Sequence, residues 1–308
     1  DRYTPRTRSG TVGGYECAHQ GRTARHFQNV GRDLELLANQ RNHTFMQSIQ
    51  STKSDKGVLT LVMSRPEVHN AFDSNMIREL TTALQAAEED ADVRLVVVTG
   101  QGACFSAGAD MNWMRSLINA SEEENERDAM QLATLMRTLN YLSVPTIARI
   151  NGAAFGGGLG LIAACDITIA AEHANFGLTE ARLGLAPAVI SPYVIRRIGE
   201  RFARRYFLTG ERFDTRQAKS IGLIQQSVAP EKLDEAVEAV IDNLLKCAPN
   251  AQTTCKQLVY AIAGHDEDTQ LSMAEYTSKV IAGLRIMDEG QEGLAAFLEK
   301  RKPDWVDG

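Results

Sequence analysis

The sequence has few aromatic residues, few cysteines and no long uncharged apolar run. Phe, Trp and Tyr make up only 6% of its 308 residues. No apolar stretch approaches the roughly 20 residues that cross a bilayer, so we expect no membrane span. The cysteines are odd in number, scattered and without a Cys-x-x-Cys pair, which argues against disulfides and favours a reducing compartment, the cytoplasm or an organelle matrix. They are Cys17, Cys104, Cys165, Cys247 and Cys255.

Positive charge is also not in excess. The chain carries 33 Lys and Arg against 39 Asp and Glu, a net charge of -6. With no basic stripe or lysine cluster, nucleic acid is an unfavourable main partner. His69, His173 and His265 lie far apart without metal-ligand spacing, so we expect no metal. A hydrophobic fraction of 44% is ample for a large buried core.

Residues 1–45 differ from the rest in composition. They hold seven Arg and no Lys, and the first methionine is Met46. Two interpretations stay open: a leader or upstream segment that is not part of the natural protein, and an Arg-rich organelle transit segment. We therefore predict an irregular segment over 1–45, a catalytic core over 46–245 and a helical region over 246–308.

From residue 57 onward, strand and helix patterns alternate. Apolar runs predict strands over 58–64, 94–100, 144–150 and 165–171. Asp73 caps a predicted helix, and Ser121 with Glu124 forms a capping box for a helix running to about residue 140. After Pro187 the spacing is helical, over 189–198, 201–208, 231–247, 249–263 and 267–285. The order indicates an α/β core followed by helices, whose apolar stripes favour a homo-oligomer.

A glycine cluster follows the strand at 144–150, in the stretch NGAAFGGGLGLIAACDI (151–167). Its spacing does not fit the Gly-x-Gly-x-x-Gly of a dinucleotide cradle, and the Gly-Lys-Ser/Thr of a phosphate loop is absent. What is left is close backbone approach at a helix N-terminus, where unpaired N–H groups suit an oxyanion. The alternative is tight packing of strand on helix alone.

A second loop rich in glycine and alanine, FSAGADMNWM (105–114), also follows a buried strand. It would place another backbone N–H at the same end of the sheet. Two such donors converging on one carbonyl oxygen form an oxyanion hole, in which removing one donor costs about 2.7–4 kcal/mol in other enzymes.

Five separated motifs resemble the crotonase (enoyl-CoA hydratase/isomerase) superfamily. They are IARINGAAFGGGLGLIAACDI, FSAGAD, FGLTEARLGLAPA, TGERFDTRQAKSIGLI and EGLAAFLEKRKPDW, in the family's order across 46–308. The resemblance implies a spiral of ββα units with a C-terminal helical trimerisation region, assembled as a homotrimer or a dimer of trimers. It implies an acyl-CoA thioester substrate and no cofactor besides the coenzyme A of that substrate. The N–H groups of Ala109 and Gly157 would then hold the thioester oxygen.

The same resemblance bears on the acid and base. Hydratases of the family use two carboxylates, one of which matches Glu180, while the position of the other is Gly160. Gly160 either makes room for a branched acyl group or marks a lost hydratase activity. The surrounding motifs look like the branch that hydrates 3-methylglutaconyl-CoA, and the related isohexenylglutaconyl-CoA hydratases share this look. The substrates of both carry a 3-alkyl branch and a distal carboxylate. Arg115, Arg182 and Tyr193 are the candidates to meet that carboxylate.

Other residues have matches in the family pattern. Asn70 and Ala71, with the backbones of Ser106 and Ala107, match the loops that meet coenzyme A. Lys300 is a candidate for its phosphates, and Asp110 is expected to cap the turn after the oxyanion loop.

We therefore predict hydration of a branched 2-enoyl-CoA in the bacterial cytoplasm or mitochondrial matrix. A water or the substrate's own carboxylate would replace the missing second acid. The alternatives are a Δ3,Δ2-enoyl-CoA isomerase with Glu180 as its single base and, in a different class, an RNA-binding protein.

Overall fold

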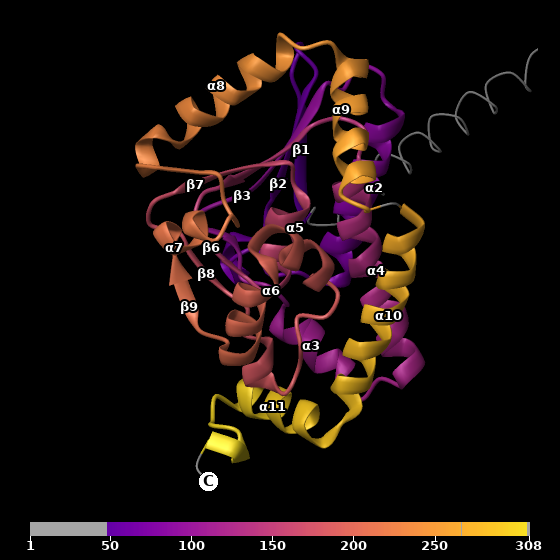
Figure 1. The fold of residues 1–308 in the computed structure, drawn as a ribbon. Helices are drawn as coiled ribbons and strands as arrows, with labels where there is room; N and C mark the ends of the chain where they lie inside the picture. Colours follow the sequence, from indigo (N-terminus) through magenta and orange to yellow (C-terminus); the bar gives the residue numbers. More distant parts are fainter. Residues whose placement is uncertain (1–47, 266, 307–308) are drawn as a thin grey trace, which may run out of the picture. The chain divides into compact units, whose positions relative to one another are not determined.

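The computed structural model describes residues 48–265 and 267–306, in which the strands form two sheets (Figure 1). The predicted segment 1–45 lies outside the described residues. The larger sheet has the order β1 (Ile49–Lys53), β2 (Val58–Met63), β3 (Leu95–Gly100), β5 (Thr146–Ile150), β7 (Ile167–Ala171) and β10 (Gln226–Val228). The smaller sheet has the order β4 (Cys104–Ser106), β6 (Ala153–Phe155), β8 (Asn175–Gly177) and β9 (Arg212–Asp214).

Three times the chain passes through one strand of each sheet and then forms helix. β3 and β4 precede α3 (Met111–Leu117) and α4 (Glu122–Tyr141), β5 and β6 precede α5 (Gly157–Ala164), and β7 and β8 precede α6 (Ser191–Thr209). The turn from β5 to β6 stacks closely on the turn from β3 to β4. A Cβ on Gly152 in the first would lie 1.9 Å from the carbonyl oxygen of Ala103 in the second. This repeat is the ββα spiral that the motifs led us to expect, and the fold prediction is confirmed.

The larger sheet is covered on both faces, which explains why β3 is apolar throughout. Val96 and Val98 belong to the main core, while Leu95 and Val97 face a second cluster with Val237 of α8 (Leu233–Leu245). All six residues of β3 are buried. A strand buried on both faces cannot alternate with polar residues, so its sequence is a continuous apolar run.

The helix signals in the sequence are confirmed at their N-termini. The Asp73 carboxylate accepts a hydrogen bond from the N–H of Met76 at the start of α2 (Ser74–Glu89). Ser121 and Glu124 form both bonds of the capping box at α4. Within α6, Gly199 has φ 74° and ψ 159°, which separates the two helical segments that the sequence predicted.

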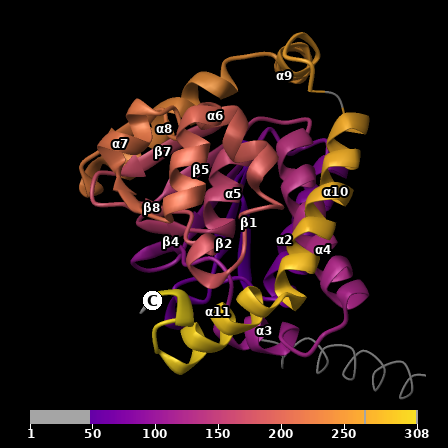
Figure 2. The same ribbon diagram turned by 60° about the horizontal axis from the view of Figure 1, so that its bottom comes forward.

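Three further helices end the chain: α9 (Pro249–Ile262), α10 (Glu267–Ile286) and α11 (Asp288–Glu299). α10 runs along α4, and α11 lies beside α3 and the short 3-10 helix η2 (Glu180–Leu183) (Figures 1 and 2). α11 falls within the helical region predicted over 246–308, although its bounds were not among the predicted helical segments. The boundary at 245/246 falls after α8, and the trimerisation role of the helices beyond it stays a prediction. Among the described residues, no helix is both long and apolar enough to span a membrane.

Candidate active site

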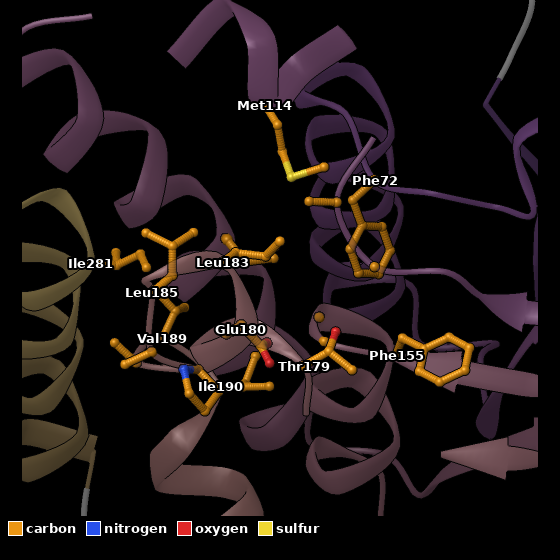
Figure 3. A pocket seen from close by; sticks show the side chains of 18 of the residues that line it. Phe72, Met114, Phe155, Thr179, Glu180, Leu183, Leu185, Val189, Ile190 and Ile281 are labelled. Carbon is orange, nitrogen blue, oxygen red and sulfur yellow. The ribbon is translucent and has the colours of Figure 1, made fainter. Parts of the chain in front are cut away.

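Three adjacent strands of the smaller sheet end at one cavity. β4 pairs with β6 and β6 with β8, all in parallel. Parallel strands have their carboxyl ends at the same edge, and ligands bind outside that edge in open α/β sheets. Ala109 follows β4, Gly157 follows β6 and Glu180 follows β8. All three line a cavity of about 320 Å³, in which Figure 3 shows the side chain of Glu180.

The N–H of Ala109 points away from its neighbouring strand segment. Phe72 and Ala109 form a parallel bridge in which the Phe72 N–H donates to the carbonyl of Gly108, and the N–H of Asp110 donates to the carbonyl of Phe72. In such a bridge the N–H of the central residue faces the other side, because successive backbone groups alternate. Ala109 lines the cavity, so its N–H is available to a ligand there.

Gly157 provides the second donor because it is the first residue of α5. The first N–H groups of a helix have no carbonyl one turn earlier to bond with, and they lie at the positive end of the helix dipole. The preceding residue, Gly156, has φ 48° and its N–H donates to the carbonyl of Gly177. That backbone conformation turns the chain abruptly from β6 into the helix.

The glycines bring the two donor loops together. A Cβ on Gly156 would lie 3.9 Å from the Cα of Gly108, and a Cβ on Gly158 would lie 3.0 Å from the carbonyl oxygen of Ser106. On Gly157 it would lie 2.7 Å from the ring of Phe72. The cluster therefore serves close backbone approach, as predicted, with each glycine facing a different neighbour.

Glu180 is an ionisable group close to the glycine cluster. A Cβ on Gly156 would lie 3.1 Å from its Oε1, while its Oε2 is buried and has no hydrogen-bond partner among the described residues. Burial raises the pKa of Glu180 to about 7, and its own backbone N–H opposes the shift only in part. A carboxyl group with such a pKa can both accept and donate a proton at neutral pH.

The rest of the cavity wall is largely apolar. Figure 3 shows Met114 and Phe72 on one side of Glu180, and Leu183, Leu185, Val189 and Ile281 around it. An apolar wall desolvates the carboxyl group, which is the physical cause of its raised pKa. It also fits an acyl chain.

Gly160 lies outside this wall, and of the two accounts of this residue the structure does not support the one in which it makes room for an acyl group. It is buried one turn into α5, where a Cβ would lie 2.4 Å from Cγ2 of Ile190 and 3.0 Å from Cε of Met136. The space is filled by protein. Ile190 lines the cavity, so Gly160 makes room for this apolar side chain from behind the wall.

Several predicted binding residues hold the oxyanion loop in position. The side chain of Asn70 is buried and binds the backbones of Arg65, Gln101 and Cys104. Ser106 Oγ donates to the carbonyl of Asn70 and accepts from the N–H of Gly108. Ala107 lines the cavity beside them.

Asp110 caps α3, as predicted. Its Oδ1 accepts from the N–H groups of Asn112 and Trp113, and its Oδ2 pairs with Arg65 at 2.9 Å. Arg65 also pairs with Asp73 at 2.9 Å, so it joins the cap of α2 to the cap of α3. The sequence analysis missed Arg65, because its two partners lie 8 and 45 positions away.

Four other candidates do not line the cavity. Arg115 is exposed and donates to Asn112 within α3, and Lys300 is exposed at the end of α11. Tyr193 and Ala71 are buried, with 2% and 5% of their surfaces exposed. Of the predicted partners for a distal carboxylate, only Arg182 lines the cavity, where it is exposed.

One charged pair in the wall was not predicted. Arg285 of α10 and Asp128 of α4 both line the cavity and pair at 3.1 Å, with only 12% and 11% of their side chains exposed. Burial raises the pKa of Asp128 and lowers that of Arg285, and each charge opposes the shift of the other. They are 157 positions apart, so no local pattern could join them. Among the described residues, no cluster of three or more His, Cys, Asp and Glu could hold a metal.

Comparisons with known proteins agree with this geometry. The family model described as Enoyl-CoA hydratase/isomerase matches residues 53–308. The chain is 30% identical to the 2,3-dehydroadipyl-CoA hydratase of Escherichia coli over 80% of this chain and 94% of that one. It is 32% identical to the enoyl-CoA hydratase ACTT6 of Alternaria alternata over 78% of each. The crystal structure of an enoyl-CoA hydratase from Shewanella pealeana matches with a TM-score of 0.69 and 42% identity, covering 88% of this chain and 98% of that one.

Proposed function

This chain belongs to the enoyl-CoA hydratase/isomerase family, and on that premise we propose that it adds water to a 3-branched 2-enoyl-CoA such as 3-methylglutaconyl-CoA. The observation that carries the proposal is Glu180, a buried carboxyl group with a pKa of about 7 in the same cavity as two free backbone N–H groups. This set of groups supports addition to a thioester whose carbonyl oxygen becomes negatively charged.

The N–H groups of Ala109 and Gly157 bind the thioester oxygen. When a nucleophile adds at C3, the negative charge moves to that oxygen as an enolate. Donors fixed by the strand ends and the start of α5 stabilise this charge more than they stabilise the neutral carbonyl, so they lower the barrier.

Glu180 handles the proton twice. Its carboxylate accepts a proton from water as the C3–O bond forms, and the resulting carboxylic acid donates that proton to C2 of the enolate. The balance is one water gained, with Glu180 returned to its starting state. A pKa near working pH suits both transfers, and a single carboxylate is then enough.

The branched acyl group with a distal carboxylate is the finer part of the proposal. It is supported by the resemblance of GADMNWMR (108–115) and EARLGLAPAVISPYV (180–194) to the methylglutaconyl-CoA branch. A relative named for 2,3-dehydroadipyl-CoA, an acyl group that also ends in a carboxylate, adds support.

A second candidate is Δ3,Δ2-enoyl-CoA isomerisation. Ile190 and Met136 fill the space beside Gly160, so no second carboxylate stands there. Isomerisation moves one proton between C2 and C4 and needs one base, which Glu180 supplies.

Product mass separates the two reactions. The purified protein is mixed with 3-methylglutaconyl-CoA and, separately, with a straight-chain 3-enoyl-CoA. We expect the branched substrate to gain one water. A shifted double bond in the 3-enoyl-CoA at unchanged mass, without hydration of the branched substrate, would replace hydration by isomerisation.

The assembly and the compartment belong to the same proposal. Leu258, Val259 and Ile262 of α9 are exposed large apolar side chains, which supports a homotrimer or a dimer of trimers built through the C-terminal helices. The cytoplasm of a bacterium or the mitochondrial matrix is the compartment that this metabolism favours.

A further inference from the structure

Arg285 lies where a bound acyl chain can reach it. It follows Ile281 by one turn on the same face of α10, and both residues line the cavity. In the view of Figure 3, Ile281 and Phe155 lie on opposite sides of Glu180. Arg285 therefore belongs to the wall formed by the helices α3, α4 and α10, and not to the strand ends that carry the two N–H donors.

Only part of the guanidinium is used by the protein. Nη1 donates to Oδ2 of Asp128 at 3.1 Å. The same nitrogen is 3.3 Å from the side-chain Oδ1 of Asn125 and 3.5 Å from the carbonyl oxygen of Asn125. Among the described residues, Nε and Nη2 have no acceptor, and neither is among the fully buried unpaired nitrogens. The edge formed by Nε and Nη2 is therefore free.

Asp128 is, by contrast, fully engaged. Its Oδ1 accepts from Nε1 of Trp113 at 2.9 Å, and its Oδ2 accepts from Arg285. The carboxylate fixes the Arg285 side chain through Nη1 and compensates its charge in the absence of a ligand. A guanidinium held at one nitrogen still offers the planar two-donor edge that matches a carboxylate.

We propose that the free edge of Arg285 binds a carboxylate at the far end of the acyl group, and that this contact selects dicarboxylic acyl-CoA thioesters. The proposal rests on the proposed function in that the ligand is an acyl-CoA. An otherwise apolar cavity favours plain hydrocarbon chains, so a partly used buried cation there changes which chains bind. Arg182 and Arg212 also line the cavity. Arg182 is exposed and was itself predicted as a partner for the distal carboxylate, so it serves as the control.

Binding of saturated thioesters tests the proposal without turnover. Glutaryl-CoA and valeryl-CoA have the same number of acyl carbons and differ in the terminal carboxylate. We expect calorimetric titration to show glutaryl-CoA binding to the wild-type protein about tenfold or more tightly, the range of a charge-assisted bidentate pair. In Arg285→Met, glutaryl-CoA should lose that advantage while valeryl-CoA binds within about twofold of wild type.

Two further variants keep the test decisive. Arg285→Lys retains a charge to pair with Asp128 and so protects the fold, but it lacks the planar edge, and we expect the preference to fall to a few-fold. Arg182→Met should leave the preference unchanged. Equal binding of the two thioesters by the wild-type protein, or a preference that survives both Arg285 variants, would overturn the inference alone. If neither thioester binds, the proposed function fails as well.

Discussion

The cavity has two walls that are built differently. The sheet wall presents Ala109, Gly157 and Glu180 from the ends of three paired strands, and the first two present backbone N–H groups. The helix wall presents side chains from α3, α4 and α10, among them Trp113, Asp128 and Arg285. The registers of a sheet fix backbone donors tightly, whereas side chains on packed helices can be exchanged without moving a strand. We therefore expect the positions of the two N–H donors to tolerate little change, whereas substitutions in the helix wall can change which acyl groups bind.

The largest effect on kcat is expected from removing Glu180, the carboxylate of the sheet wall. Glu180→Gln keeps the size of the side chain and removes the base, so we expect kcat to fall by about 10²–10⁴-fold with the affinity for saturated acyl-CoA little changed. Steady-state kinetics and calorimetric binding measure the two quantities. A variant that retains wild-type kcat would show that another group moves the proton.

Disturbing a backbone donor should cost less than removing the base. A methyl group on Gly157 would lie 2.7 Å from the Phe72 ring, and the backbone of Phe72 holds both Gly108 and Asp110. Gly157→Ala should therefore shift both donors and lower kcat by about 10²-fold, near the lower end of the loss for one oxyanion donor.

Gly283→Ala in α10 is the matched control for that substitution. A Cβ on Gly283 would meet no atom of the described residues within 4 Å, so we expect unchanged kcat and a gain of about 0.5–1 kcal/mol in the free energy of unfolding. If Gly157→Ala retains wild-type kcat, the donor geometry tolerates more movement than the sheet wall implies.

The sheet wall could be predicted from the sequence because its signals are local. Apolar runs marked the first strand of each repeat, and glycine clusters marked the loops that carry the donors. The second strands have only three residues each, too short for any periodicity, so the smaller sheet was not predicted. Ala109, Gly157 and Glu180 were named through the resemblance to the crotonase superfamily, and no local signal gave the parallel pairing of the short strands that brings them together.

The helix wall could not be predicted in this way. Arg115 and Tyr193 looked suitable because they lie close in sequence to recognised motifs, yet neither lines the cavity. Which face of a helix meets the cavity depends on how that helix packs against segments distant in sequence, as α10 packs along α4. The surroundings of Gly160 could not be predicted for the same reason, because its neighbour Ile190 lies 30 positions away in the sequence.

The pH dependence distinguishes a desolvated Glu180 from an ordinary one. The active base is the carboxylate and its pKa is about 7, so kcat/KM should fall about tenfold for each pH unit below 7 and level off above it. An inflection near pH 4.5 would mean that water reaches the carboxyl group and that the apolar wall does not control it.

Stability provides a control that does not depend on turnover. Between about pH 4.5 and 7 the carboxyl group of Glu180 keeps its proton in the folded state and has released it in the unfolded state. The free energy of unfolding should therefore fall as pH rises through this window, by at most about 1.4 kcal/mol per unit. Denaturant titrations should show the slope in the wild-type protein and a flatter curve in Glu180→Gln.

Among the substitutions close to the cavity, the smallest effect on rate is expected at Gly160, which packs against Ile190 behind the cavity wall. Gly160→Glu forces a Cβ to 2.4 Å from Cγ2 of Ile190, and such overpacking lowers the free energy of unfolding by about 1–3 kcal/mol. We expect turnover to fall only several-fold, because Gly160 itself lies outside the cavity wall.

Ile190→Ala alone should lower the free energy of unfolding by about 2–5 kcal/mol. The double variant should lose less stability than the sum of the two single variants, because Ile190→Ala makes the space that Gly160→Glu needs. Urea titrations of the four proteins measure this coupling. If Gly160→Glu alone keeps its stability and raises turnover of the branched substrate, the space beside Gly160 is open, and a second carboxylate can be added to the sheet wall without moving Ile190.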